Sequence, residues 1–154
     1  TLTQMYRGRA DWDAIARAAK LIRETTTLVL GNGDVESMEG LVGRVRDTHV
    51  HGVLIGRGAL GRPWIFRAKD WAKAQVNQGT SSGPMYEVPL QVRFRVALEH
   101  ARCFESLGGT SRFAAMLKHL GWYCTGFFKA AEVRAQMFRA ANSQDVERIL
   151  AAIG

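Results

Sequence analysis

Apolar residues in the first half of the chain follow two alternating patterns. Short apolar runs at Thr27–Leu30 and Gly52–Ile55 predict two strands, and the first lacks polar alternation, which is typical of a fully buried parallel strand. Apolar residues at helical spacing predict helices over about 11–24, with Asp11 as its N-cap, and over 36–47. This alternation of strands and helices predicts an α/β architecture with a parallel sheet.

From residue 90 onward the pattern is helical, with no strand signal. Its spacing predicts helices over about 90–107 and 110–124, a third around 128–138, and a last helix with Ser143 as its N-cap. The inward-facing residues of the second and third helices are predicted to be Phe113, Met116, Leu117, Leu120, Phe128, Ala131, Ala135 and Phe138. Amphipathic helices joined by short turns indicate an antiparallel bundle.

The two patterns meet at a stretch rich in Gly, Ser and Pro, which is the composition of a linker. We therefore expect an α/β part at residues 1–76, a linker at 77–89 and an all-α part at 90–154.

Each predicted strand ends in a glycine turn that opens a helix, Gly31–Asp34 after the first and Gly56–Gly61 after the second. Backbone N–H groups at such turns bind anions, and glycine lets a phosphate approach closely. Either turn alone is more typical of an ordinary strand-to-helix connection, but two at the ends of neighbouring strands predict a phosphate site like that of a (β/α)8 barrel. The second turn also reads G-x-G-x-x-G, yet no strand ending in an acid follows about twenty residues later, as a dinucleotide-binding unit requires.

Charge adds a second indication. The chain of 154 residues has a formal charge of +7, which fits a polyanionic partner, an anionic ligand or simply a basic domain. Residues 90–139 hold eight basic residues against three acids.

Candidate metal ligands are few. Cys103 and Cys124 form no C-x-x-C motif, and His49 and His51 lack a third ligand at the usual spacing. We expect two reduced core thiols, no metal and a cytoplasmic protein. No apolar run is long enough for a membrane span.

Four blocks in order resemble the C-terminal half of tRNA-dihydrouridine synthases of the bacterial B-type branch. They are Gln4–Trp12, Gly31–Asp34, Ile55–Phe66, and Lys118–Tyr123 with Arg134 downstream. A (β/α)8 barrel needs at least about 200 residues. The resemblance therefore implies a fragment, with the last two βα units of an FMN-binding barrel followed by a helical tRNA-binding domain.

The family's activity is the reduction of the 5,6 double bond of a uridine in tRNA by FMN, with NADPH as the reductant. By the resemblance, Asn32, Gly33 and Asp34 bind FMN, and Gly56 and Arg57 offer backbone N–H groups to its phosphate. The family's catalytic cysteine and flavin-contacting lysine belong to the earlier half of the barrel. This chain alone is therefore expected to be an inactive monomer that binds little flavin.

The resemblance also implies a tRNA-binding surface formed by Arg112, Lys118, His119 and Arg134. Spacing alone favours a solvated helix face, with Trp122 and Tyr123 in the core. Two other readings stay open: an FMN-dependent barrel oxidoreductase of a small molecule, and a non-catalytic RNA-binding module.

Overall fold

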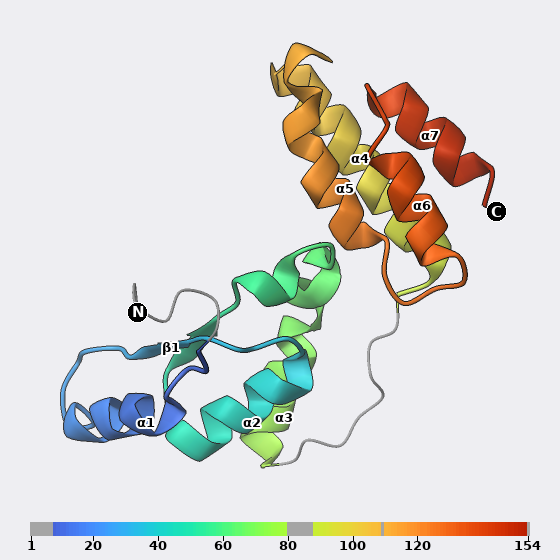
Figure 1. Cartoon of the computed structure of the whole chain (residues 1–154). Coiled ribbons are helices and arrows are strands. Elements are labelled where there is room, and N and C mark those ends of the chain that lie inside the picture. Colours follow the sequence, from blue (N-terminus) through green and yellow to red (C-terminus); the bar gives the residue numbers. More distant parts are fainter. Residues whose placement is uncertain (1–7, 80–87, 109, 154) are drawn as a thin grey trace. The chain divides into compact units, whose positions relative to one another are not determined.

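A computed structural model of the chain describes residues 8–79, 88–108 and 110–153 (Figure 1). It forms two compact units. The sheet unit comprises residues 1–59 and 64–86, and the helical unit comprises residues 60–63 and 87–154. The start of the first motif block, with Gln4 and Tyr6, and most of the predicted linker lie outside the described residues.

The sheet unit is built around a two-stranded parallel sheet. Strand β1 (Leu30–Asn32) pairs with β2 (Gly52–Leu54), with Leu30 opposite Gly52. Helix α1 (Trp12–Leu21) precedes β1, and α2 (Met38–Thr48) connects the two strands. After β2 come two 3-10 helices, η1 (Arg57–Ala59) and η2 (Pro63–Ala68), and then α3 (Lys69–Gln78). The predicted parallel sheet is confirmed for these two strands.

Helices α1 and α2 begin at residues whose side chains bind free backbone N–H groups. Asp11 accepts a hydrogen bond from the N–H of Ala14, as predicted, and Ser37 does the same for Gly40 at the start of α2. Helices α2 and α3 pack against each other over a small core. Its buried residues are Met38, Val42, Ile65, Ala68 and Ala72.

The expectation that the first strand is fully buried is wrong. Strand β1 begins at Leu30, the last residue of the predicted run, and both Leu28 (69% exposed) and Leu30 (53%) face solvent. A parallel strand is buried only when both of its faces are covered. Among the described residues β1 pairs with β2 alone, so the apolar run lacks the neighbours that would cover it.

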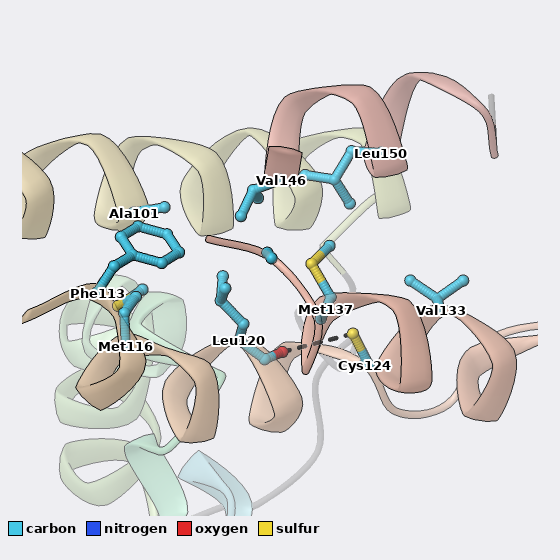
Figure 2. Packing of buried hydrophobic residues seen from close by; sticks show 10 residues of the cluster. Ala101, Phe113, Met116, Leu120, Cys124, Val133, Met137, Val146 and Leu150 are labelled. Carbon is cyan, nitrogen blue, oxygen red and sulfur yellow. Dashed lines mark hydrogen bonds between the residues drawn. The ribbon is translucent and has the colours of Figure 1, made fainter. Parts of the chain in front are cut away.

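The helical unit packs five elements against one another. They are α4 (Leu90–Gly108), η3 (Thr110–Met116), α5 (Leu117–Tyr123), α6 (Ala130–Met137) and α7 (Ser143–Ala151) (Figure 1). Helix α4 contacts η3, α5 and α7, and α6 contacts α5 and α7. Side chains from all five elements or the turns beside them meet in one core (Figure 2). Its most deeply buried large residues are Phe113, Met116, Leu120, Met137 and Val146.

The apolar face of α6 differs from the prediction. Val133 and Met137 are buried, whereas Phe128 (86% exposed) and Phe138 (49%) are not. Ala131 and Ala135 are exposed as well. Phe128 lies before the helix, which begins only at Ala130 after two residues with positive φ, Gly126 and Lys129, and Phe138 is its C-cap. Within α6, the face with Val133 and Met137 packs on the core, and the face with Ala131 and Ala135 does not.

Three smaller expectations also change. The predicted helix at 110–124 is a 3-10 helix as far as Met116. The N-cap of α7 is Asn142, whose side chain accepts the N–H of Asp145, while Ser143 is buried as the first helical residue. Cys103 is exposed, and only Cys124 is a core thiol, which donates to the Leu120 carbonyl (Figure 2).

Leu120 has no exposed surface and lies in the centre of the helical core. Leu120→Ala should lower the free energy of unfolding of the helical unit by about 2–5 kcal/mol, because it removes packing contacts and leaves a cavity. Denaturant unfolding followed by far-UV circular dichroism measures the change. Leu107→Ala is the matched control, since Leu107 is 85% exposed and its loss should cost less than about 0.5 kcal/mol. Equal effects of the two changes would contradict the packing described.

Candidate functional site

The two glycine turns lie at the same edge of the sheet. Because β1 and β2 are parallel neighbours, the residues that follow each strand emerge on the same side. Gly58 brings the turns into direct contact. A Cβ at this position would lie 2.2 Å from the carbonyl oxygen of Val35, a distance that no side chain tolerates. The second turn therefore packs on the backbone that follows the first.

An ion pair joins the same two turns. Arg57 Nη2 lies 2.9 Å from Asp34 Oδ1, and Asp34 Oδ2 accepts the N–H of Ala10 at 2.6 Å. The Arg57 side chain is 57% exposed, so the pair contributes at most about 1 kcal/mol to stability. Its main effect is geometric: Asp34 Oδ1 holds the guanidinium at the sheet edge, while Oδ2 ties the same carboxylate to the N–H of Ala10.

Trp12 packs against the first turn and forms a hydrogen bond with it. The indole Nε1 donates to the Gly33 carbonyl at 3.0 Å, and a Cβ at Gly31 would lie 2.5 Å from the indole ring. Gly33 has φ +119, a conformation that side chains rarely adopt. The guanidinium carbon of Arg44 lies over the Trp12 ring, 4.9 Å from the ring centre. The sequence offered no signal for these contacts beyond a tryptophan at the start of α1.

Gly56 differs from the other glycines of the turns because its surroundings are open. A Cβ there would meet nothing within 4 Å, so a ligand has free access to the backbone. Asn32 is also exposed. The structure thus brings together all five predicted cofactor residues, Asn32, Gly33, Asp34, Gly56 and Arg57. Accessible backbone next to a fixed arginine is an arrangement that fits a phosphate group.

The predicted RNA-binding residues lie on three contacting elements of the helical unit. Arg112 is on η3, Lys118 and His119 are on α5, and Arg134 is on α6. Arg112, Lys118 and Arg134 are exposed. Arg134 also has a structural contact, because its Nε donates to the Gly121 carbonyl at 3.0 Å and so ties α6 to α5.

His119 differs from the three cations. Its ring is half-buried and lies edge-on to Trp122, at 4.8 Å between ring centres, and to His100, at 5.5 Å. Burial, with smaller effects of His100 and Lys118, lowers the pKa of His119, and burial also lowers the pKa of His100. His119 is therefore neutral at pH 7 and offers a ring and a hydrogen bond rather than a positive charge.

Ion pairs are unevenly distributed over the helical unit. On α4 and α7, Arg95 pairs with Glu99 (4.0 Å), Arg102 with Glu147 (2.8 Å), and Arg148 with Asp145. We call residues 112–139 the cationic segment. Within the described part of the chain, five of its cations have no carboxylate partner: Arg112, Lys118, Lys129, Arg134 and Arg139. The uncompensated positive charge is thus concentrated on η3, α5 and α6.

Among the described residues, no group of three His, Cys, Asp or Glu side chains is placed to hold a metal ion. In the same residues, each helix is too short or too polar to cross a membrane.

Comparison with known families decides which proteins the chain is related to. The model of the family described as "Dihydrouridine synthase (Dus)" matches residues 1–153. The chain belongs to the dihydrouridine synthase family. The resemblance seen in the four sequence blocks is therefore confirmed, and the match includes both units.

Individual dihydrouridine synthases show the same relationship. The chain is 29% identical over 151 residues to "Probable tRNA-dihydrouridine synthase 1" of Synechocystis, covering 97% of this chain and 40% of that protein. It is 32% identical over 150 residues to "Probable tRNA-dihydrouridine synthase" of Mycobacterium tuberculosis (97% and 37%). It is 33% identical over 144 residues to "tRNA-dihydrouridine synthase B" of Pseudomonas aeruginosa (93% and 41%). The chain thus spans about two fifths of the length of these relatives.

The lowered pKa values of His100 and His119 predict how stability depends on pH. In the unfolded chain the two histidines have pKa values of about 6.5, so they bind protons more readily there than in the folded unit. Keeping both rings neutral therefore stabilises the folded unit fully above the unfolded pKa, and this stabilisation is lost as the pH falls through the lowered folded pKa values. Denaturation midpoints of the helical unit, measured between pH 7.5 and pH 5, should therefore decrease toward acid.

His119→Gln should reduce this decrease, because one of the two groups no longer titrates. His49→Asn is the control, since exposed His49 lies in the sheet unit with φ 55, which asparagine tolerates. The same pH dependence in the His119 variant and the unchanged chain would contradict the assignment.

Proposed function

We propose that this chain takes part in the flavin-dependent reduction of uridine to 5,6-dihydrouridine in tRNA. The observation that carries the proposal is the pair of glycine turns joined by Arg57 and Asp34, in a chain of the dihydrouridine synthase family. The relatives described above are named as tRNA-dihydrouridine synthases. Because these relatives are longer than this chain, the complete reaction is proposed for a protein of their length.

We further infer that β1, α2, β2 and the helices after β2 form the last part of a (β/α)8 barrel. Two parallel strands joined by a helix are its repeating unit. The exposed Leu28, Leu30 and Leu54 support this inference, because the neighbouring strands and helices of a barrel would cover such apolar side chains. Residues 90–154 would then be the helical tRNA-binding domain.

The residues of the sheet edge suit the phosphate of FMN. When bound, reduced FMN would supply the hydride for the uridine 5,6 double bond, with a proton completing the reduction, and NADPH would return the oxidised flavin to its reduced form. Gly56 and Arg57 would donate backbone N–H groups to the phosphate, and the Arg57 guanidinium would balance its charge. Asn32 and Gly33 line the same edge. Asp34 would act by holding Arg57 in place, because both of its oxygens already accept hydrogen bonds.

The helical unit would hold the RNA. Lysine and arginine side chains without acidic partners bind phosphates by displacing counterions, and the cationic segment carries five of them. A stacked uridine hides its ring face, so the target base must leave the stack to react. Contacts to the RNA backbone away from that base can supply the binding energy for this step. This charge distribution favours an RNA substrate over a small molecule.

The phosphate site can be tested with Gly56→Val in a chain of the relatives' full length that carries these residues. The branched side chain would occupy the open space beside the turn, so FMN affinity should fall roughly tenfold or more, as expected for losing a hydrogen bond to a charged group. Flavin fluorescence titration measures the affinity.

Gly43→Val on α2 is the matched control, because a Cβ there also meets nothing within 4 Å but lies away from the turns. Its FMN affinity should be unchanged. Equal FMN affinity of the Gly56 and Gly43 variants would show that Gly56 does not contact the FMN phosphate.

The RNA surface can be tested with Lys118→Ala. Lys118 is exposed and has no ion-pair partner among the described residues, so the change should weaken tRNA binding without loss of helix. The slope of log affinity against log salt should flatten by about one unit for the lost phosphate contact. Fluorescence titrations at several salt concentrations measure both quantities.

Arg95→Ala removes the same charge from α4, where Arg95 is paired with Glu99, and should leave the slope nearly unchanged. The same response from both variants would mean that net charge alone governs binding. An FMN-dependent protein with no tRNA affinity would instead support a small-molecule oxidoreductase.

A further inference from the structure

The connection between α5 and α6 carries two adjacent phenylalanines that point in different directions. Phe127 is half-buried and packs edge-on against Phe94 of α4, with 5.4 Å between ring centres. Phe128 is 86% exposed and is among the most exposed large apolar side chains of the described residues. Single exposed apolar side chains are common, so a function for Phe128 depends on how the backbone holds the ring and on the charge beside it.

The backbone fixes this outward position. Gly126 and Lys129, on either side of the pair, have φ of +68 and +60, and the N–H of Ala130 donates to the Phe127 carbonyl at 3.2 Å. Arg93 on α4 donates to the carbonyls of Tyr123 and Thr125, and its guanidinium lies 5.7 Å from the Phe127 ring centre. The connection is therefore anchored on both sides of Phe128, and the exposed ring is presented by an ordered backbone.

A cation lies beside the exposed ring. Lys129 Nζ is 5.6 Å from the centre of the Phe128 ring. Lys129 belongs to the cationic segment and has no carboxylate partner in the part of the chain that the structure describes. An exposed aromatic ring beside an uncompensated cation is a combination by which proteins hold unpaired nucleotides, with stacking on the base and charge on the backbone.

We propose that Phe128 stacks on an unpaired nucleobase of the bound RNA while Lys129 contacts the adjoining phosphate. This inference rests on the proposed RNA-binding function and adds a base contact to it. A protein partner would favour an apolar surface without uncompensated charge, whereas the neighbours of Phe128 suit a polyanion. The pre-ordered connection lowers the entropic cost of placing the ring against a base.

Phe128→Ala is the direct test, in the 154-residue chain. Its affinity for tRNA should fall roughly 5- to 100-fold, which is the range for removing one base-stacking aromatic ring. The salt slope should stay unchanged because no charge is lost. Phe128→Trp should retain the affinity, and the fluorescence of the added indole should be quenched when tRNA binds.

Two controls separate stacking from other effects. Leu107→Ala removes a similarly exposed apolar side chain from α4 and should leave affinity unchanged. A fully paired RNA duplex offers no unpaired base, so Phe128→Ala should leave its weaker binding unchanged. Equal loss of affinity for duplex and tRNA, or no loss for either, would overturn the stacking proposal.

The result also distinguishes this inference from the proposed function. If Lys118→Ala flattens the salt slope while Phe128→Ala has no effect, the RNA surface stands and the stacking contact is wrong. If the chain shows no salt-dependent tRNA binding, both are wrong.

Discussion

The close approach of Gly58 to the Val35 carbonyl is the constraint on which the sheet edge depends. It sets the two turns against each other, and only a residue without a side chain allows it. Arg57 can then reach Asp34, and Gly56 stays open to solvent. The glycines of these turns therefore have two separate tasks. Gly31 and Gly58 permit packing within the protein, while Gly56 leaves room for a ligand.

The helical unit separates stability from binding in a similar way. Its core is made of apolar side chains from every helix, and the ion pairs lie mainly on α4 and α7. The cations of η3, α5 and α6 contribute little to the core, apart from Arg134, which also bonds to the Gly121 carbonyl. Leaving several like charges unpaired costs stability through repulsion, and an anionic partner would remove that cost.

Two expectations changed because spacing shows neither where a helix begins nor what packs against it. Phe128 and Phe138 were assigned to the core from their periodicity, but they lie outside α6, whose buried residues are Val133 and Met137. His119 was grouped with the cations, yet burial, with a smaller effect of His100, lowers its pKa and leaves it neutral at pH 7. The first outcome depends on the backbone of the connection, and the second on packing in the folded unit.

The sequence by itself determined the order of the elements, the parallel strands, the Asp11 cap and the family, since these follow from local patterns and short motifs. Only the tertiary structure decided which groups meet: Arg57 with Asp34, Trp12 with Gly33, and Arg93 with the connection that presents Phe128. These contacts join residues about twenty or more positions apart. Local periodicity carries no information about such distances, because it reports how a segment folds and not what packs against it.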